Sequence, residues 1–423
     1  MSHVGLWFKE KKYAWMLVMF LWMFGFVGAA TRFVLSYYQN DISEQLNVSH
    51  SFISFTWSLN MIVVLLCTSF GGWLTDRYGP KIVMSISTFF MIAGAAIIVI
   101  FNSSTAFIVG FGLVLGLTGI SSTTAYVLVF NWFKHHRAKA MTIISSAVPL
   151  GLAIMSPIFI WSEGKLTWES AFWFSLIFGS VMIPLTLLLV RDKDKGRVDE
   201  VLEEENEEQA EKLSFKQRVQ FVFISFKNPA LLVVMLALFT CGFNMGTTDM
   251  HFMAMQQHSH VHQAVQTVTL TVLGILELSG AFVFGYLLDR YPRTLILSII
   301  YGIRIIAFGF LFFTVGINPI IFAFLFGGSF LGAIPGGMLV AGEALKGTGK
   351  QIAILLIFHQ LGSILGASVG GITFDAFNSY SVIIMLNIIL TTASCVGYYW
   401  VYQISKNKKN QTHPTIEQPI SAT

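Results

Sequence analysis

The chain has 423 residues, of which 55% are hydrophobic and only 11% are charged, and its formal net charge is +4. Because water-soluble proteins carry about 25% charged residues, this composition argues against a soluble enzyme of several domains. The small net charge also argues against a nucleic-acid-binding protein. The three cysteines, Cys67, Cys241 and Cys395, lie in apolar blocks at unrelated spacings, so the sequence predicts neither a disulfide framework nor a metal site.

Twelve long apolar blocks predict twelve transmembrane helices, since one span needs about 20 apolar residues. The first six blocks cover residues 13–38, 52–74, 81–101, 104–131, 139–161 and 168–190. The other six cover residues 229–255, 263–288, 294–315, 318–345, 350–373 and 380–403. Strands of a membrane barrel would be about 10 residues long with alternating polarity, and these blocks do not alternate. The predicted fold class is therefore an all-α membrane protein.

The basic residues predict the orientation of these spans. With the N-terminus inside, all but three of the 26 Lys and Arg residues fall in cytoplasmic segments; Lys165 is external, and Arg32 and Arg304 lie within spans. This asymmetry follows the positive-inside rule. We therefore expect a multi-pass protein of the inner (cell) membrane with both termini in the cytoplasm.

The same span count divides the chain into four regions. We expect a six-helix bundle over residues 1–190, a cytoplasmic linker over 191–228, a second six-helix bundle over 229–405 and a disordered cytoplasmic tail over 406–423. The linker is hydrophilic and carries an acidic run followed by basic residues, which is typical of a solvated connection that partly lies along the membrane surface.

A short segment recurs in both halves of the chain. Residues 72–81 join the second and third spans, and residues 285–293 join the eighth and ninth spans about half a chain length later. Two six-span repeats of the same orientation are typical of alternating-access transporters. We predict that the repeated residues form a cytoplasmic gate, in which glycine allows close helix packing and the charges contact neighbouring helix ends in one state only. These residues are Gly72, Asp76, Arg77, Gly285, Asp289 and Arg290.

Residues 72–81 resemble the signature of the major facilitator superfamily, and the resemblance extends from Tyr13 to Tyr402. Within that superfamily, three further segments are similar to the monocarboxylate porter branch and its bacterial relatives. These segments are residues 131–137 with Ala140, residues 249–252, and residues 359–362 with 374–375. The resemblance implies two six-helix bundles, no enzymatic activity and alternating-access transport of a small organic anion.

Ionisable residues within membrane spans are costly and mark functional sites or buried pairs. Arg32 has no carboxylate in the apolar blocks of its own half, so it either binds an anionic substrate, pairs with Asp249 across the two halves, or faces lipid headgroups or water. The resemblance supports the first alternative, because Arg32 falls where monocarboxylate porters carry a substrate-binding lysine. Tyr126 is a further candidate for the cavity lining.

Glu277 and Arg304 are predicted at matching depth on either side of the turn between spans eight and nine. They form either a structural ion pair or a proton site in which Glu277 is the carrier. The resemblance matches Glu277 to a porter aspartate, but the porter arginine four residues later is Ala281 here, so we conjecture that Arg304 supplies that charge to the substrate. Asp249 and His251 are further candidates for proton coupling, although a buried histidine is also a common packing residue.

Other intramembrane groups give weaker signals. Glu343 lies near the cytoplasmic end of span ten, where we expect a gate contact with Lys346 or Lys350 rather than with substrate.

These expectations define a secondary transporter of a monocarboxylate-like anion, with proton symport, in a lipid bilayer. The sequence contains no phosphate-binding signature of the Gly-x-x-x-x-Gly-Lys-Ser/Thr type, so a gradient rather than ATP is the expected energy source, and no cofactor is expected. We expect a monomer. The alternatives are an exporter or exchanger of a larger metabolite, metal chelator or drug, or a sensor that keeps the fold without turnover. No catalytic constellation supports an intramembrane enzyme.

Overall fold

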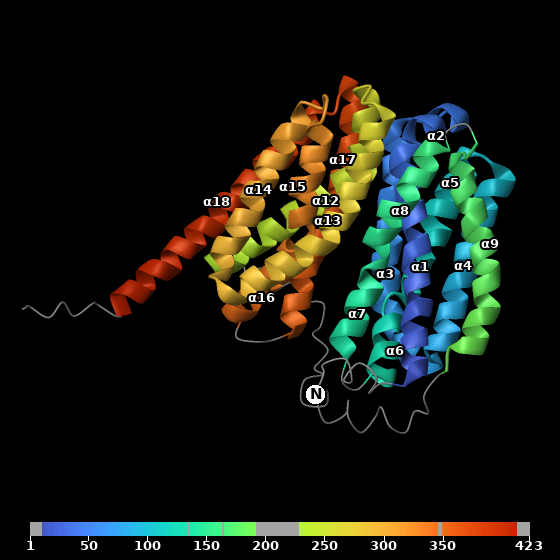
Figure 1. Cartoon of the computed structure of the whole chain (residues 1–423), viewed down its shortest axis with the longest axis horizontal. Helices are drawn as coiled ribbons and strands as arrows, with labels where there is room; N and C mark the ends of the chain where they lie inside the picture. Colours follow the sequence, from blue (N-terminus) through green and yellow to red (C-terminus); the bar gives the residue numbers. More distant parts are fainter. Residues whose placement is uncertain (1–10, 134–135, 163–164, 192–227, 346–348, 413–423) are drawn as a thin grey trace, which may run out of the picture.

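The computed structural model describes residues 11–133, 136–162, 165–191, 228–345 and 349–412, and these ranges fold into two bundles of helices (Figure 1). Twelve helical segments within these ranges are long and apolar enough to cross a membrane, which confirms the predicted number of spans. Six of them precede residue 190 and six follow residue 228, so each bundle has six spans.

The N-terminal bundle begins with a long helix and a short helix that lies at its end. Its elements are α1 (Lys12–Tyr37), α2 (Gln39–Leu46), α3 (His50–Tyr78), α4 (Pro80–Phe101), α5 (Ser104–Phe107), the π-helix η2 (Ile108–Val114), the 3-10 helix η3 (Leu115–Ser121), α6 (Thr124–Trp132), α7 (Arg137–Ser145), α8 (Ala147–Trp161) and α9 (Trp168–Leu189). The predicted linker falls almost entirely outside the described residues.

The C-terminal bundle is more regular. Its elements are α12 (Pro229–His258), α13 (Gln263–Arg290), α14 (Arg293–Phe312), α15 (Asn318–Phe330), α16 (Ala333–Leu345), α17 (Gly349–Phe377) and α18 (Ser381–Thr412). The last helix corrects the predicted disorder from residue 406, because α18 continues to Thr412. A helix that satisfies its own backbone hydrogen bonds can continue past an apolar span into a polar stretch.

The two copies of the repeated segment make different turns. Gly79 links α3 to α4 with φ +85°, a conformation that glycine adopts readily, and Pro80 follows at the first position of α4. In the second copy, Tyr291 has φ −121° and Pro292 precedes α14, so no left-handed residue is needed. The glycine after the first Asp-Arg pair therefore has a backbone role that its counterpart does not need.

The contacts between the bundles follow the repeat. Helix α3 packs against α17, α8 packs against α13, and α1 packs against α12. These pairs join span two to span eleven, span five to span eight, and span one to span seven. Exchanging the two halves turns the pair of spans two and eleven into the pair of spans eight and five, and it turns the pair of spans one and seven into itself. This symmetry is expected for parallel repeats related by a pseudo-two-fold axis.

Small residues bring helices into backbone contact inside each bundle. A Cβ atom added at Gly242 of α12 would collide with the backbone of His359 on α17, and one added at Gly366 would collide with the backbone of Phe243. In the other bundle, a Cβ at Gly151 of α8 would lie 2.6 Å from that of Ala29 on α1. Close packing of this kind replaces the hydrophobic effect, which does not act between helices in lipid.

The fourth span departs from the predicted single helix. It is α-helical at its two ends, π-helical over Ile108–Val114 and 3-10 helical over Leu115–Ser121. Glycines within it pack against α3 and α4. Backbone carbonyl oxygens that lack their α-helical N–H partner accept hydrogen bonds from side chains instead. Asn60 Nδ2 donates to Phe111 O over 2.7 Å, and Ser87 Oγ donates to Thr118 O over 3.0 Å. Within the membrane, such irregular backbone is stable only where it is packed against other parts of the protein or lines a water-filled cavity.

Candidate functional site

A cavity of about 550 Å³ lies between the two bundles. Its volume falls within the range of about 300–1,000 Å³ that is typical of small-molecule sites. Most of the lining comes from the N-terminal bundle and combines aromatic and methionine side chains with hydroxyl groups. These residues are Leu21, Phe24, Val27, Gly28, Trp57, Asn60, Met61, Met84, Ser87, Thr88, Met91, Phe111, Leu115, Thr118, Ser121, Thr124, Ala125, Phe172 and Ser175.

The C-terminal bundle supplies the ionisable groups of the cavity. Met245 and Asp249 extend from α12, and His359 and Ser363 extend from the facing helix α17. His359 Nε2 lies 3.3 Å from Met245 Sδ. Asp249 is half-buried and is the only carboxylate among the described residues that line this cavity.

Asp249 also borders a second, much smaller space. This pocket has a volume of about 20 Å³, which is room for about one water molecule, and it lies between α1, α8, α12 and α13. Ser36 and Thr248 provide its other polar groups, and Ser36 Oγ accepts a hydrogen bond of 3.4 Å from the backbone N–H of Met253. The Asp249 carboxylate therefore lies between the large cavity and a small, mostly apolar pocket at the contact between the bundles.

Arg32 lies on α1, but its side chain is outside the part of the structure that is described. The helical register still relates this position to the cavity. Gly28, four residues earlier, lines the large cavity, and Ser36, four residues later, lines the small pocket. The face of α1 that carries Gly28 and Ser36 therefore lies toward both spaces. Substrate binding by Arg32 and its pairing with Asp249 both stay predictions.

Arg304 is fully buried in the C-terminal bundle and lines neither cavity. Its Nη2 donates to the carbonyl oxygens of Ser329 and Phe330 over 2.9 and 3.1 Å. These carbonyls end α15, where the tenth span breaks before α16, so the guanidinium caps the negative end of a helix. The rings of Tyr301 and Phe326 lie 5.4 and 5.3 Å from its Cζ. The contacts described for Arg304 belong to its own bundle.

Glu277 and His251 are also buried away from the cavity. Glu277 is 1% exposed on α13, and its predicted pairing with Arg304 stays a prediction. His251 is completely buried between α12 and α17, where its Nε2 lies 2.8 Å from the carbonyl oxygen of Ala367. This is the hydrogen-bonded packing position that we considered for a histidine in a span.

Tyr126 lies elsewhere than we expected, because its side chain is 52% exposed and lines neither cavity. The preceding 3-10 turns explain the difference. Leu115, Thr118, Ser121 and Thr124 all line the cavity at intervals of three residues, which is the period of a 3-10 helix. The sequence alone was interpreted as a continuous α-helix, for which a different set of residues would face the cavity.

The predicted gate residues lie at the end of the bundles that carries the turn between α3 and α4. Asp76, Arg77, Asp289 and Arg290 are all exposed there. Arg77 lies over the rings of Trp73 and Tyr78, and Arg290 Nη1 donates to Tyr286 Oη over 3.1 Å.

One expectation about this end needs correction. A Cβ atom at Gly72 or Gly285 would meet nothing within 4 Å, so neither glycine permits close packing in this conformation. The neighbouring Gly71 does so instead, against the backbone of Ile120. Glu343 binds Arg293 over 2.5 Å, and its predicted contact with Lys346 or Lys350 falls on side chains outside the described residues and stays a prediction. Although Asp76 is exposed, partial desolvation at the end of α3 raises the pKa of its carboxyl above the ordinary value.

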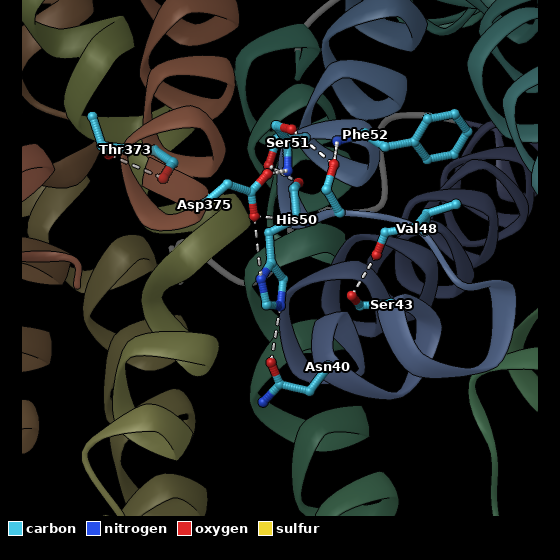
Figure 2. Close-up of polar contacts among 11 residues, drawn as sticks. Asn40, Ser43, Val48, His50, Ser51, Phe52, Thr373 and Asp375 are labelled. Atoms are coloured by element: carbon cyan, nitrogen blue, oxygen red, sulfur yellow. Dashed lines mark hydrogen bonds and ion pairs between the residues drawn. The ribbon is translucent and has the colours of Figure 1, made fainter. Parts of the chain in front are cut away.

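The opposite end of the cavity is closed by polar contacts between the bundles. Asp375 of α17 accepts hydrogen bonds from the backbone N–H groups of His50 and Ser51 at the start of α3 (Figure 2). At the other contact between the bundles, Trp161 Nε1 donates to Thr267 Oγ1 over 3.1 Å, and Gln263 donates to Ile160 O. Figure 1 agrees, because the bundles lean together at the end that carries α2 and separate toward α16 and α7.

Our sequence analysis did not identify this closure. Asp375 was noted only as part of a resemblance, and His50 was not noted at all. The one local signal is Ser49, which caps α3 by accepting a 3.2 Å hydrogen bond from the N–H of Phe52 and so marks a helix start.

Comparison with known proteins agrees with the fold. The sequence matches the Major Facilitator Superfamily over residues 20–350 and 254–422. An uncharacterized MFS-type transporter of Bacillus subtilis (strain 168), YcxA, is 23% identical over 415 residues, which cover 95% of this chain and 98% of that protein. A probable galactarate/D-glucarate transporter of the same organism, GudP, is 26% identical over 197 residues, which cover 44% of this chain and 43% of that protein.

Solved structures show the same architecture. The nucleoside transporter NupG superposes with a TM-score of 0.70 at 13% identity, covering 92% of this chain and 99% of that one. A D-xylose-proton symporter superposes with a TM-score of 0.66 at 15% identity, covering 90% and 97%. Identities this low establish the fold alone, and these similarities do not single out the monocarboxylate porter branch. The chain belongs to the major facilitator superfamily: it is a multi-pass membrane transporter and not an enzyme.

Proposed function

We propose that the protein transports a small organic anion through the central cavity by alternating access, in symport with protons. The observation that carries this proposal is the cavity itself, which both bundles line, which is closed at one end by contacts between the bundles, and which contains the carboxylate of Asp249. Rocking of two repeats around such a site exposes it to the two sides of the membrane in turn.

The orientation of the chain follows from its charges. The exposed arginines Arg77 and Arg290 lie at the separated end of the bundles, and the positive-inside rule places that end in the cytoplasm. The end closed by Asp375 is then external. We therefore interpret this conformation as open to the cytoplasm, in a cell membrane where both termini are cytoplasmic.

The anionic cargo is supported by position 32 and by the relatives. An arginine on the cavity face of α1 suits a carboxylate, which its planar guanidinium binds through two parallel hydrogen bonds. Relatives of this chain include a probable galactarate/D-glucarate transporter and a hexuronate transporter, both of Bacillus subtilis (strain 168). The proposal therefore covers aliphatic monocarboxylates and sugar acids alike.

Proton coupling is supported by the position of Asp249. A carboxylate that borders the cavity exchanges protons with water in it, whereas Glu277 and His251 are buried inside the C-terminal bundle. Binding of an anion beside Asp249 would favour the protonated acid, because two adjacent negative charges repel each other. The cargo and the proton would then be bound together, which is the requirement for symport.

Uptake into proteoliposomes tests the proposal. Wild-type protein is expected to accumulate at least one acid from a panel of aliphatic and sugar acids when the outside is acidic, and Arg32→Gln is expected to reduce that uptake at least tenfold. Arg293→Gln is the matched control, since Arg293 pairs with Glu343 at the surface. Normal uptake by Arg32→Gln would contradict the anion site, and uptake that ignores the pH gradient would contradict proton symport.

A further inference from the structure

The 3-10 helix η3 and the first residue of α6 place a row of hydroxyl groups along one wall of the central cavity. Thr118, Ser121 and Thr124 line the cavity at intervals of three residues. Thr118 and Ser121 both lie in η3, where residues three apart are eclipsed and differ in height by about 6 Å at 2.0 Å per residue, and Thr124 begins α6, the next helix. In an α-helix, residues three apart differ in direction by about 60°, so the same three side chains would spread apart around the helix.

Each hydroxyl in this row has a hydrogen-bond acceptor for its single proton within the protein. Thr118 Oγ1 donates to Leu115 O over 2.6 Å, and Thr124 Oγ1 donates to Ser121 O over 2.6 Å. Ser121 Oγ lies 3.1 Å from Thr118 O and 2.8 Å from Ser87 Oγ on α4, and its proton is donated to one of these two oxygens. Because a hydroxyl has one proton and two lone pairs, the row presents hydrogen-bond acceptors to the cavity.

Neighbouring side chains extend this pattern. Thr88 Oγ1 donates to Met84 O, and Ser175 Oγ donates to Ala171 O, both over 2.8 Å, and both residues line the cavity. Asn60 uses its amide nitrogen on Phe111 O and so retains its side-chain oxygen as an acceptor. The wall therefore offers several oxygen atoms as hydrogen-bond acceptors. The protons of its hydroxyl groups are engaged in hydrogen bonds inside the protein.

The chemistry of this wall restricts its ligand. A carboxylate only accepts hydrogen bonds, so it would find no donor among these hydroxyls in their described arrangement. An alkyl chain would displace the water that is hydrogen-bonded to these hydroxyl oxygens and would offer no hydrogen bond in its place, which is unfavourable. Hydroxyl groups of a ligand donate hydrogen bonds and satisfy the wall.

We propose that the row Thr118, Ser121 and Thr124 binds the hydroxyl groups of a polyhydroxylated cargo, so that the transported anion is a sugar acid rather than a simple aliphatic monocarboxylate. This inference rests on the proposed transport of an organic anion. The carboxylate of the cargo lies away from the row, toward the face of α1 that contains position 32, and the hydroxylated carbons lie against η3.

Ligand-induced thermal stabilisation of the purified full-length protein tests this assignment. The probes are gluconate, hexanoate and sorbitol, which have six carbons each but differ in carboxylate and hydroxyl groups. Gluconate is expected to raise the melting temperature at concentrations at which hexanoate does not. Thr118→Val and Ser121→Ala each remove one acceptor and are expected to weaken gluconate binding about 3- to 10-fold.

The control variants change the same chemical groups outside the cavity. Ser180→Ala on α9 and Thr392→Val on α18 remove exposed hydroxyls that also donate to backbone carbonyls of their own helices, and they should bind gluconate like the wild type. The melting temperature without ligand separates loss of binding from loss of folding.

Three results would overturn the assignment: hexanoate binding as tightly as gluconate, unchanged gluconate affinity in Thr118→Val and Ser121→Ala, or no stabilisation by any of the three probes. A different result separates it from the proposed function. If sorbitol binds, loses affinity in both variants, and neither acid binds, the hydroxyl row is supported and the anionic cargo is wrong.

Discussion

Asp375 caps a helix that belongs to the other bundle: its Oδ1 and Oδ2 accept hydrogen bonds of 3.2 and 2.8 Å from the backbone N–H groups of His50 and Ser51 (Figure 2). The His50 ring also lies 3.8 Å from Oδ1 through its Nδ1, and its Nε2 lies 3.0 Å from Asn40 Oδ1. The first N–H groups of a helix have no partner within the helix and carry its positive dipole end. One carboxylate therefore joins α17 to α3 only while this end of the cavity is closed.

Asp375→Asn is expected to shift the protein toward the conformation in which this end opens. The amide keeps the shape but loses the charge and one of the two accepting oxygens, which costs the closed state about 1–2 kcal/mol, or roughly a 5- to 30-fold change in the ratio of states. Spin labels at Glu44→Cys and Phe377→Cys, in a background without native cysteines, would report a longer distance population.

Glu169→Gln is the matched control for this measurement. Glu169 accepts a 2.7 Å hydrogen bond from Gln45 at the same end of the molecule, but both residues belong to the N-terminal bundle. Its loss should leave the distance distribution unchanged. An identical distribution in Asp375→Asn and wild type would show that the carboxylate does not hold the bundles together.

Asp249→Asn is expected to abolish accumulation driven by a pH gradient while exchange of labelled for unlabelled substrate continues. Exchange needs only reorientation of the loaded site, whereas accumulation needs a group that gains and loses a proton in each cycle. One coupled proton supports about a tenfold concentration gradient of substrate per pH unit. Paired uptake and exchange assays in proteoliposomes measure both. Glu277→Gln is the comparison; if it alone lost accumulation, the proton would be carried at Glu277.

The number of spans and the repeat were predictable because each depends on short, continuous stretches of the sequence. A span is a run of apolar residues, and the repeat is visible as two short segments of similar sequence, so neither depends on distant contacts. The same reasoning led to the intramembrane ionisable residues, of which Asp249 lies in the cavity.

The winding of span four was not predictable in this way. Its π and 3-10 turns depend on carbonyl partners such as Asn60 and Ser87, which other helices supply. The error at Tyr126 follows directly, because a change of helical period rotates every later side chain. The bond from His50 to Asp375 joins residues 325 positions apart, and no pattern within either segment indicates it.

Gly242→Ala and Gly366→Ala are expected to destabilise the C-terminal bundle. A methyl group at either position meets the backbone of the facing helix, which cannot move as a flexible side chain does, and overpacking of this kind costs about 1–3 kcal/mol or more. Thermal unfolding in detergent would show a lower melting temperature. Gly309→Ala on α14 is the control, since its Cβ would meet nothing within 4 Å; a similar loss there would mean that helix contact is not the cause.

Arg304→Lys tests whether this arginine holds the break between α15 and α16 or contacts the substrate. Lysine keeps the charge but lacks the planar group that donates to both Ser329 O and Phe330 O. Each buried carbonyl left without a donor costs about 1–3 kcal/mol of folding free energy. We therefore expect a lower melting temperature and an unchanged KM in the folded fraction. Arg293→Lys, which alters an exposed pair with Glu343, should change stability by less than about 1 kcal/mol. A raised KM at wild-type stability would instead place Arg304 in the substrate site.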